Sequence, residues 1–240
     1  MHVNKLDDSL PQQAYSAKMV ANNEQHIATK LDLSLYQLME MAGQSAFDVM
    51  TTRWSDAESI LVVCGNGNNA GDGFILAALA IKNGLSVTVV QVNSTAQYRG
   101  DAATARDELL RFGGTISDLD AVSFNAFDVI VDAMLGTGLN RQVNDKFGLV
   151  IDKVNQSPAK VLSIDLPSGL CANTGNVMGV SVYADATVSY IALKQGMITG
   201  QGTTACGDIY LADLAIGELF HQEISSNILL NHQTYLPKIA

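Results

Sequence analysis

Short runs rich in β-branched residues alternate with helical patterns along most of this chain, and this alternation restricts the fold more than any other feature. The runs that we expect to form strands are 60–64, 86–92, 127–132, 160–165, 186–191 and 209–211. Helices are expected over 72–83, 101–112 and 147–155. Because strands that alternate with helices usually pair in parallel and are covered on both faces, the sequence predicts an α/β fold with a mostly parallel sheet.

The residues before the first expected strand form a helical segment over 12–50, which reads as two helices. Ser34 and Gln37 have the spacing of a capping box, which marks the start of the second helix. The apolar stripe that follows at helical spacing consists of Leu35, Leu38, Met39, Ala42, Ala46 and Val49. We interpret this stripe as buried core rather than as a ligand surface. Residues 1–217 are expected to be a single domain, and 218–240 a C-terminal tail or linker.

The charge distribution excludes two classes of partner. The formal net charge is −10, from 14 basic and 24 acidic residues, and the basic residues are scattered, so we expect neither nucleic acid nor an anionic membrane as a partner. No apolar run approaches the roughly 18 residues of a membrane span, and the polar, acidic N-terminus is not a signal peptide. Cys64, Cys171 and Cys206 form no C-x-x-C pair and are expected to be reduced thiols of a cytoplasmic protein.

Polar clusters follow three of the expected strands. The first is the glycine-rich stretch 65–73, the second covers 132–142 and begins at Asp132, and the third covers 165–170 and begins at Asp165. Since the carboxyl ends of parallel strands lie at one edge of a sheet, these clusters should meet there. Either aspartate alone is as well explained by capping a loop. Together with Asp72 in the first cluster, they favour a ligand site.

Several enzyme classes are disfavoured or excluded because their sequence motifs are incomplete or absent. Residues 65–70 match the G-x-G-x-x-A spacing of a dinucleotide-binding turn. The next strand, 86–92, ends without the acid that binds the ribose of NAD, which disfavours a redox enzyme. No G-K-[ST] follows the glycines, so a P-loop is excluded. No G-x-S-x-G elbow is present and none of the four histidines falls in the three clusters, so nucleophilic triad chemistry is not expected.

Four motifs resemble a known family in order and spacing. They are G-N-G-N-N-A-G-D-G at 65–73, D-A-M-L-G-T-G-L at 132–139, S-I-D-L-P-S-G-L at 163–170 and A-D-A-T-V-S-Y-I-A-L-K-Q-G at 184–196. The family is that of the NAD(P)H-hydrate epimerases, or YjeF N-terminal domain family, and the resemblance covers about 12–215. It implies a Rossmann-like three-layer α/β/α sandwich. It also implies an isomerase that interconverts the R and S forms of hydrated NADH and NADPH (NADHX and NADPHX) at C6, for cofactor repair.

Carried over position by position, the resemblance implies two sets of ligands. The substrate would contact Asn68, Asn69, Ala70, Gly71, Asp72, Gly136, Thr137, Gly138, Leu139, Asn140, Arg141, Gln142 and Asp165. A potassium ion would be held by Asn69, Asp132 and Ser168, whose oxygens suit a hard cation. Two positions depart from the family pattern. Ala70 replaces its usual glycine, and therefore needs a backbone that accepts a Cβ, and Gln195 stands where proline is frequent.

The chemistry of the implied substrate suggests one catalytic group. The hydroxyl on C6 lies next to the ring nitrogen, so its configuration can be lost by departure of water to an iminium or by ring opening to an aldehyde. Both routes move a proton on and off an oxygen, and Asp165 is the expected acid/base, best served by a pKa raised through desolvation. Asp132 is assigned to the ion. Lys194 is interpreted as a solvated lysine rather than as a partner of a phosphate or carboxylate, and Glu24 and Glu40 as surface or helix-pairing groups.

The resemblance leaves two questions of assembly open. A homodimer is expected, and residues 218–240 look similar to the junction with an ADP- or ATP-dependent dehydratase, so the chain is either a stand-alone enzyme or the first half of a bifunctional one. The sequence has no arginine cluster for a 2′-phosphate and so favours neither NADHX nor NADPHX. The alternative function is a non-catalytic nucleotide- or protein-binding module on the same fold.

Overall fold

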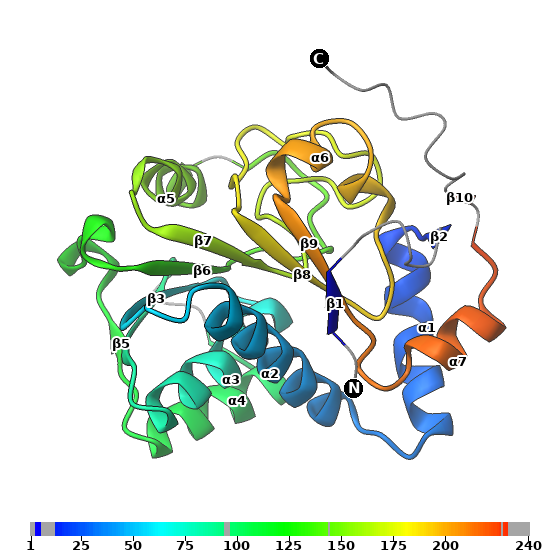
Figure 1. Cartoon of the computed structure of the whole chain (residues 1–240), viewed down its shortest axis with the longest axis horizontal. Coiled ribbons are helices and arrows are strands. Elements are labelled where there is room, and N and C mark those ends of the chain that lie inside the picture. Colours follow the sequence, from blue (N-terminus) through cyan, green and yellow to red (C-terminus); the bar gives the residue numbers. More distant parts are fainter. Residues whose placement is uncertain (1–2, 6–12, 94–96, 144, 227, 230–240) are drawn as a thin grey trace.

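The fold is built on one large sheet with helices on both faces (Figure 1). The computed structural model describes residues 3–5, 13–93, 97–143, 145–226 and 228–229. Eight strands are ordered β1-β9-β8-β7-β6-β3-β4-β5, and every neighbouring pair is parallel except β1 with β9. The predicted α/β fold with a mostly parallel sheet is confirmed.

The six predicted strands are all present, with ends shifted by one or two residues. They are β3 (Ser59–Cys64), β4 (Ser86–Gln91), β6 (Val129–Ala133), β7 (Lys160–Ile164), β8 (Ala186–Tyr190) and β9 (Asp208–Ala212). Two further strands, β1 (Val3–Lys5) and β5 (Ile116–Ser117), were not expected, and they are the two edges of the sheet. Such short strands hold few side chains, so no periodic pattern marks them.

Four long helices cover the two faces of the sheet. In Figure 1, α2 (Leu35–Arg53), α3 (Asn68–Lys82) and α4 (Gly100–Arg111) lie on one side, and α5 (Asp145–Gln156) lies on the other. Successive residues of β3 point to opposite faces, so Val62 packs in the core under α2, α3 and α4, while Val63 packs in the core under α5. This arrangement is the expected three-layer sandwich.

Two local signals of the sequence can be compared with the helices that formed. The Ser34 hydroxyl accepts the Gln37 N–H at 3.2 Å and the Gln37 side chain accepts the Ser34 N–H at 2.9 Å, which confirms the capping box of α2. By contrast, α3 begins at Asn68, four residues before the predicted start at Asp72. The two asparagines therefore lie in the first helical turn rather than in a loop.

Short elements and the chain ends complete the molecule. The single turns are η1 (Leu119–Ala121), η2 (Phe124–Ala126), η3 (Gln195–Met197) and α6 (Gly202–Ala205). The helix α1 (Ala17–Lys30) packs beside α7 (Gly217–Glu223), and β2 (Gln13–Ala14) pairs with β10 (Ile228–Leu229). The predicted domain limits, 1–217 and 218–240, stay a prediction, although residues just beyond 217 pack on the N-terminal segment. Within the described ranges, no helix combines the length and apolar character needed to cross a membrane.

Candidate active site

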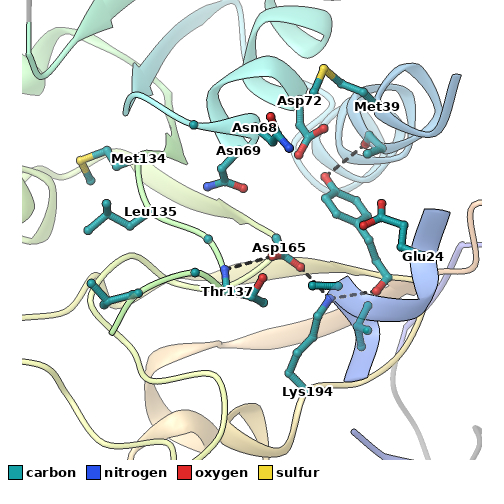
Figure 2. A pocket seen from close by; sticks show the side chains of 18 of the residues that line it. Glu24, Met39, Asn68, Asn69, Asp72, Met134, Leu135, Thr137, Asp165 and Lys194 are labelled. Carbon is teal, nitrogen blue, oxygen red and sulfur yellow. Dashed lines mark hydrogen bonds and ion pairs between the residues drawn. The ribbon is translucent and has the colours of Figure 1, made fainter. Parts of the chain in front are cut away.

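A pocket of about 680 Å³ opens at the carboxyl ends of β3, β6, β7 and β8 (Figure 2). Its walls come from α1, α2, the start of α3 and the loop that follows β6. All three polar clusters of the sequence reach this pocket, as the parallel sheet predicted. Of the thirteen residues assigned to the substrate, eleven line the pocket, and only Ala70 and Gly71 lie buried behind its wall.

The glycine-rich stretch leads directly into the first turn of α3. Gly67 is the N-cap and provides no side chain to cap the helix, so backbone N–H groups of the first turn are left for a ligand. Helix N-termini of this kind bind phosphate groups. The Tyr98 hydroxyl donates to the Gly65 carbonyl at 2.7 Å and fixes the entry to the turn.

Ala70 fits its position without strain, although the family usually has glycine there. It lies in the first turn of α3 and is fully buried, and a helical backbone accepts a Cβ readily. Gly71 cannot be replaced as easily, because an added Cβ would lie 2.5 Å from the Met39 sulfur. Both residues shape the wall from behind.

Asp165 and Lys194 form an ion pair at the floor of the pocket. The Lys194 ammonium lies 2.6 Å from Asp165 Oδ1, and it also donates to the Ser189 hydroxyl at 3.1 Å and to the Tyr190 carbonyl at 2.8 Å. The lysine is 2% exposed and the aspartate 15%. The interpretation of Lys194 as solvated was therefore wrong, because its ammonium reaches back to Ser189 and Tyr190 at the end of β8 and is buried there. Figure 2 shows the pair below Asp72.

The backbone of Asp165 is strained. Its φ of 64° lies in the left-handed region, which non-glycine residues seldom occupy. Its carboxylate is held at both oxygens, because Oδ2 accepts the Thr137 N–H at 3.3 Å while Oδ1 accepts Lys194. Strained residues of this kind often lie at functional sites. In this left-handed conformation, the chain leaves the direction of β7 at Asp165, and the carboxylate lines the pocket.

Asp132 does not line the pocket but is buried in a network of hydrogen bonds. Its carboxylate accepts the Ser163 hydroxyl at 3.0 Å, the Ser168 N–H at 2.8 Å, the Ser168 hydroxyl at 2.5 Å and the Met134 N–H at 3.2 Å. The side chain is fully buried and has no ion-pair partner among the described residues. Burial raises the pKa of Asp132, and the four hydrogen bonds oppose that shift. A buried carboxylate without a cation is costly.

The residues assigned to a potassium ion have a donor set that fits it. Both polar atoms of the Asn69 amide are buried without a hydrogen-bond partner in the described part of the chain. A Cβ added at Gly136 would lie 3.5 Å from the Asn69 amide oxygen and 3.2 Å from Asp165 Oδ2. Amide, hydroxyl and carboxylate oxygens suit a hard cation. No group of three or more His, Cys, Asp or Glu side chains is placed to hold a metal within the described ranges.

Two further carboxyl groups face the pocket. Burial is the main reason that the pKa of Asp72 is raised well above its usual range, and the charges of Asp165 and Glu24 add to the shift while Lys194 opposes it. Burial also raises the pKa of Glu24, again with a contribution from Asp165. In Figure 2, Asp72 reaches into the pocket from α3, opposite Asp165, and Glu24 enters from α1. The interpretation of Glu24 as a surface or helix-pairing group was incomplete, whereas Glu40 is exposed as expected.

Sequence reasoning missed several lining residues. Glu24 shares one face of α1 with Val20 and Ala21, which also line the pocket, and this helical spacing was the available signal. The apolar stripe of α2 was assigned to the core alone. Its later members are core, and Leu38, Met39 and Ala42 are buried but also form the apolar wall of the pocket. The prediction was wrong for Leu35, which is 38% exposed and lines the pocket from the first turn of the helix.

Comparisons with known proteins identify the family of this chain. Residues 35–196 match the model of the family described as YjeF-related protein N-terminus. The chain is 38% identical over 208 residues to the bifunctional NAD(P)H-hydrate repair enzyme Nnr of Escherichia coli, covering 87% of this chain and 40% of that protein. It is 33% identical to the NAD(P)H-hydrate epimerase of Weissella koreensis, covering 89% of this chain and 99% of that one. The chain thus spans less than half of the bifunctional relative and nearly all of the epimerase.

A solved structure supports the fold. The crystal structure of the yeast protein ynu0 superposes with a TM-score of 0.74 and covers 92% of this chain and 100% of its own, at 19% identity. The family match covers more than half of the chain, and a relative above 30% identity is matched over almost its whole length. This chain therefore belongs to the YjeF N-terminal domain family.

Proposed function

We propose that this chain is an NAD(P)H-hydrate epimerase, which interconverts the R and S forms of NADHX and NADPHX at C6. The main observation in support of this proposal is the Asp165–Lys194 ion pair at the floor of the pocket. The same pocket contains the N-terminus of α3, which no side chain caps. A carboxylate that can exchange a proton, placed near an anion-binding turn, suits a dinucleotide whose reacting carbon bears a hydroxyl. The names of the relatives from E. coli and W. koreensis support the same activity.

The pocket offers a distinct surface to each part of such a substrate. The first turn of α3 can receive the pyrophosphate, and the exposed Arg141 at the rim can add a positive charge. The apolar wall of α2 can cover a ring. The hydrated nicotinamide then lies over Asp165, with Lys194 holding that carboxylate in place.

Asp165 is the proposed catalytic residue. Protonation of the C6 hydroxyl as it leaves, or removal of its proton as the ring opens, requires a group that both gives and takes a proton. The lysine that contacts Asp165 is a positioning residue, because its three hydrogen bonds are all made within the protein. The sequence expectation of a desolvated Asp165 did not include the cationic partner that its carboxylate has in the structure.

A potassium ion is part of the proposal. Asn69, Asp132 and Ser168 would hold it, since the Asn69 amide lacks a partner and the buried Asp132 lacks a cation in the described structure. The ion would supply the positive charge that Asp132 needs and so keep the loop after β6 in place. Raising potassium at constant ionic strength should then raise the Tm of the wild-type protein, whereas sodium should raise it less. An equal response to both ions would contradict a specific site.

The function is tested with one pure epimer of NADHX or NADPHX. The loss of stereochemical purity is followed with and without the protein, in potassium and in sodium buffers. We expect the protein to accelerate epimerisation far above the spontaneous rate, and Asp165→Asn to reduce kcat by roughly 10²–10⁴-fold. Binding of the hydrate without acceleration would instead identify a non-catalytic nucleotide-binding module.

We further propose that the chain acts in the cytoplasm, forms a homodimer and works with an ADP- or ATP-dependent NAD(P)H-hydrate dehydratase. Three free cysteines suit a reducing compartment. The bifunctional relatives, of which this chain matches about 40% of the length, support the link to a second repair activity. Mass analysis of the native product decides whether the two activities share one chain.

A further inference from the structure

Two carboxyl groups face the pocket from opposite sides and differ in their surroundings. Asp165 is held at both oxygens, by Lys194 at 2.6 Å and by the Thr137 N–H at 3.3 Å. Asp72 projects from the first turns of α3 and forms no ion pair with any described residue. Figure 2 shows its carboxyl group above the space that Asp165 faces from below. The pocket therefore has one carboxylate with a cation and one carboxyl group without.

The surroundings of Asp72 favour its protonated form. Burial, with the nearby charges of Asp165 and Glu24, raises the pKa of Asp72 well above its usual range. The Lys194 ammonium lies 2.6 Å from Asp165 Oδ1. One carboxyl group that has a cationic partner and a second that has none, on opposite sides of a pocket, can divide the roles of acid and base in one reaction.

Inversion at C6 by loss of water needs proton transfer at both faces of the ring. The departing oxygen leaves one face, and the returning oxygen must add to the other. A single acid/base on one face returns water to the face from which it left, and so restores the original configuration. Two groups on opposite faces remove this limit.

We propose that Asp72 and Asp165 act together as the two proton-transfer groups of the epimerase, one on each face of the hydrated nicotinamide. This inference rests on the proposed function. In one direction, the Asp72 carboxylic acid gives its proton to the C6 hydroxyl, the C6–O bond breaks, and water leaves with the bonding electrons. The ring nitrogen supplies its lone pair to form the C=N bond of the iminium.

The second half of the reaction puts a hydroxyl group back on C6. A water molecule adds to C6 from the opposite face, the C=N electrons return to nitrogen, and the proton of that water goes to the Asp165 carboxylate. The opposite epimer runs the same steps in reverse, with Asp165 as the acid and Asp72 as the base. After each turnover, proton exchange with solvent at the pocket opening restores the starting protonation of Asp72 and Asp165. No oxidant, reductant or co-reactant other than water is consumed.

The first experiment follows solvent oxygen in the wild-type protein. One pure epimer is incubated in water enriched in ¹⁸O, and mass spectrometry reports the label in the newly formed epimer at early times. We expect every newly formed molecule to carry one solvent oxygen. Retention of the original oxygen would show ring opening and overturn the proposal. A wild-type protein that does not accelerate epimerisation at all would instead contradict the proposed function, so the two failures are distinguishable.

The second experiment distinguishes the role of Asp72 from that of Asp165. Asp72→Asn and Asp165→Asn should each lower epimerisation at least 100-fold. Each variant keeps a group on one face, so each should still exchange the oxygen of one epimer with solvent, with retention of configuration, at least tenfold faster than it epimerises. The two variants should prefer opposite epimers, an asymmetry that loss of structure does not produce.

The control is Asp152→Asn, a matched change at an exposed position of α5, which should keep wild-type rates. Urea unfolding of Asp72→Asn and Asp165→Asn verifies that both variants are folded in the assay. Epimerisation by folded Asp72→Asn within twofold of the wild-type rate would overturn the proposal. The same holds if both folded variants lose oxygen exchange for both epimers.

Discussion

Lys194 and Asp165 are 29 residues apart in the chain, yet their charged atoms are 2.6 Å apart in the fold. Asp165 directly follows β7, and Lys194 lies four residues after the end of β8. The two residues meet because β7 and β8 are adjacent and end at the same edge. At the residue scale, the site thus depends on which strands are neighbours.

Removing the Lys194 ammonium should affect both stability and turnover. Lys194→Met leaves the partly buried Asp165 carboxylate unpaired, which we expect to lower the free energy of unfolding by about 3 kcal/mol. It should also lower kcat with little change in KM, because the substrate contacts remain. Urea unfolding and steady-state kinetics measure the two effects. Lys153→Met on α5 is the exposed control, and equal behaviour of the two variants would contradict a role for Lys194.

At the element scale, the connection between β3 and α3 shapes the pocket. The helical pattern was expected from residue 72, because the apolar periodicity begins near there, whereas the helix itself begins at Asn68. Polar residues in a first turn contribute nothing to an apolar stripe, so the pattern alone places the start too late. Gly67 as N-cap was compatible with the sequence, but only the fold shows that the turn packs closely on the loop after β6.

That close packing predicts different tolerance at two glycines. A Cβ at Gly65 would lie 1.8 Å from the Met134 carbonyl oxygen, whereas one at Gly138 would meet no atom within 4 Å. Gly65→Ala should therefore lower the free energy of unfolding by about 1–3 kcal/mol, and Gly138→Ala should change it by less than about 0.5 kcal/mol. Denaturant unfolding compares them, and equal values would contradict the close approach of the two backbones at Gly65.

The packing of α7 on the N-terminal segment makes a second prediction at this scale. Phe220 is fully buried, with its ring centroid 5.1 Å from that of Tyr15. Phe220→Ala should lower the free energy of unfolding by about 3–5 kcal/mol, because it removes a large buried side chain. A loss below about 1 kcal/mol in urea unfolding would favour a loosely attached tail after residue 217.

At the scale of the whole molecule, function and stability oppose each other in the pocket. Glu24, Asp72 and Asp165 all face it, and Lys194 is the buried cation beside them. Burying several carboxyl groups together costs free energy whenever they ionise. Proteins commonly retain such costs at functional sites, so a variant that loses activity here can gain stability.

Asp72→Asn tests this opposition through its pH dependence. The folded-state pKa of Asp72 is raised above its ordinary value of 3.8, so the fold favours the protonated form. The contribution to stability is therefore fully present below pH 3.8 and is lost as pH rises through the raised pKa. Asparagine does not ionise, so the variant should be more stable than wild type at about pH 7, with a difference that shrinks towards about pH 4. Urea unfolding across that range measures it, and a difference independent of pH would contradict the assignment.

The amino-acid sequence by itself determined the fold class, six strands of the sheet, the capping box of α2 and the edge at which the polar clusters meet. These features follow from local periodicity, from cap residues and from the rule that the carboxyl ends of parallel strands lie at one edge of a sheet. Tertiary structure decided the burial and the partners of individual side chains. It buried Lys194 against Asp165, brought Glu24 from α1 into the pocket, set Asp72 opposite Asp165 and left the Asn69 amide without a partner among the described residues. Those contacts join residues far apart in sequence, and their energies depend on burial and neighbouring charge, which only the folded chain defines.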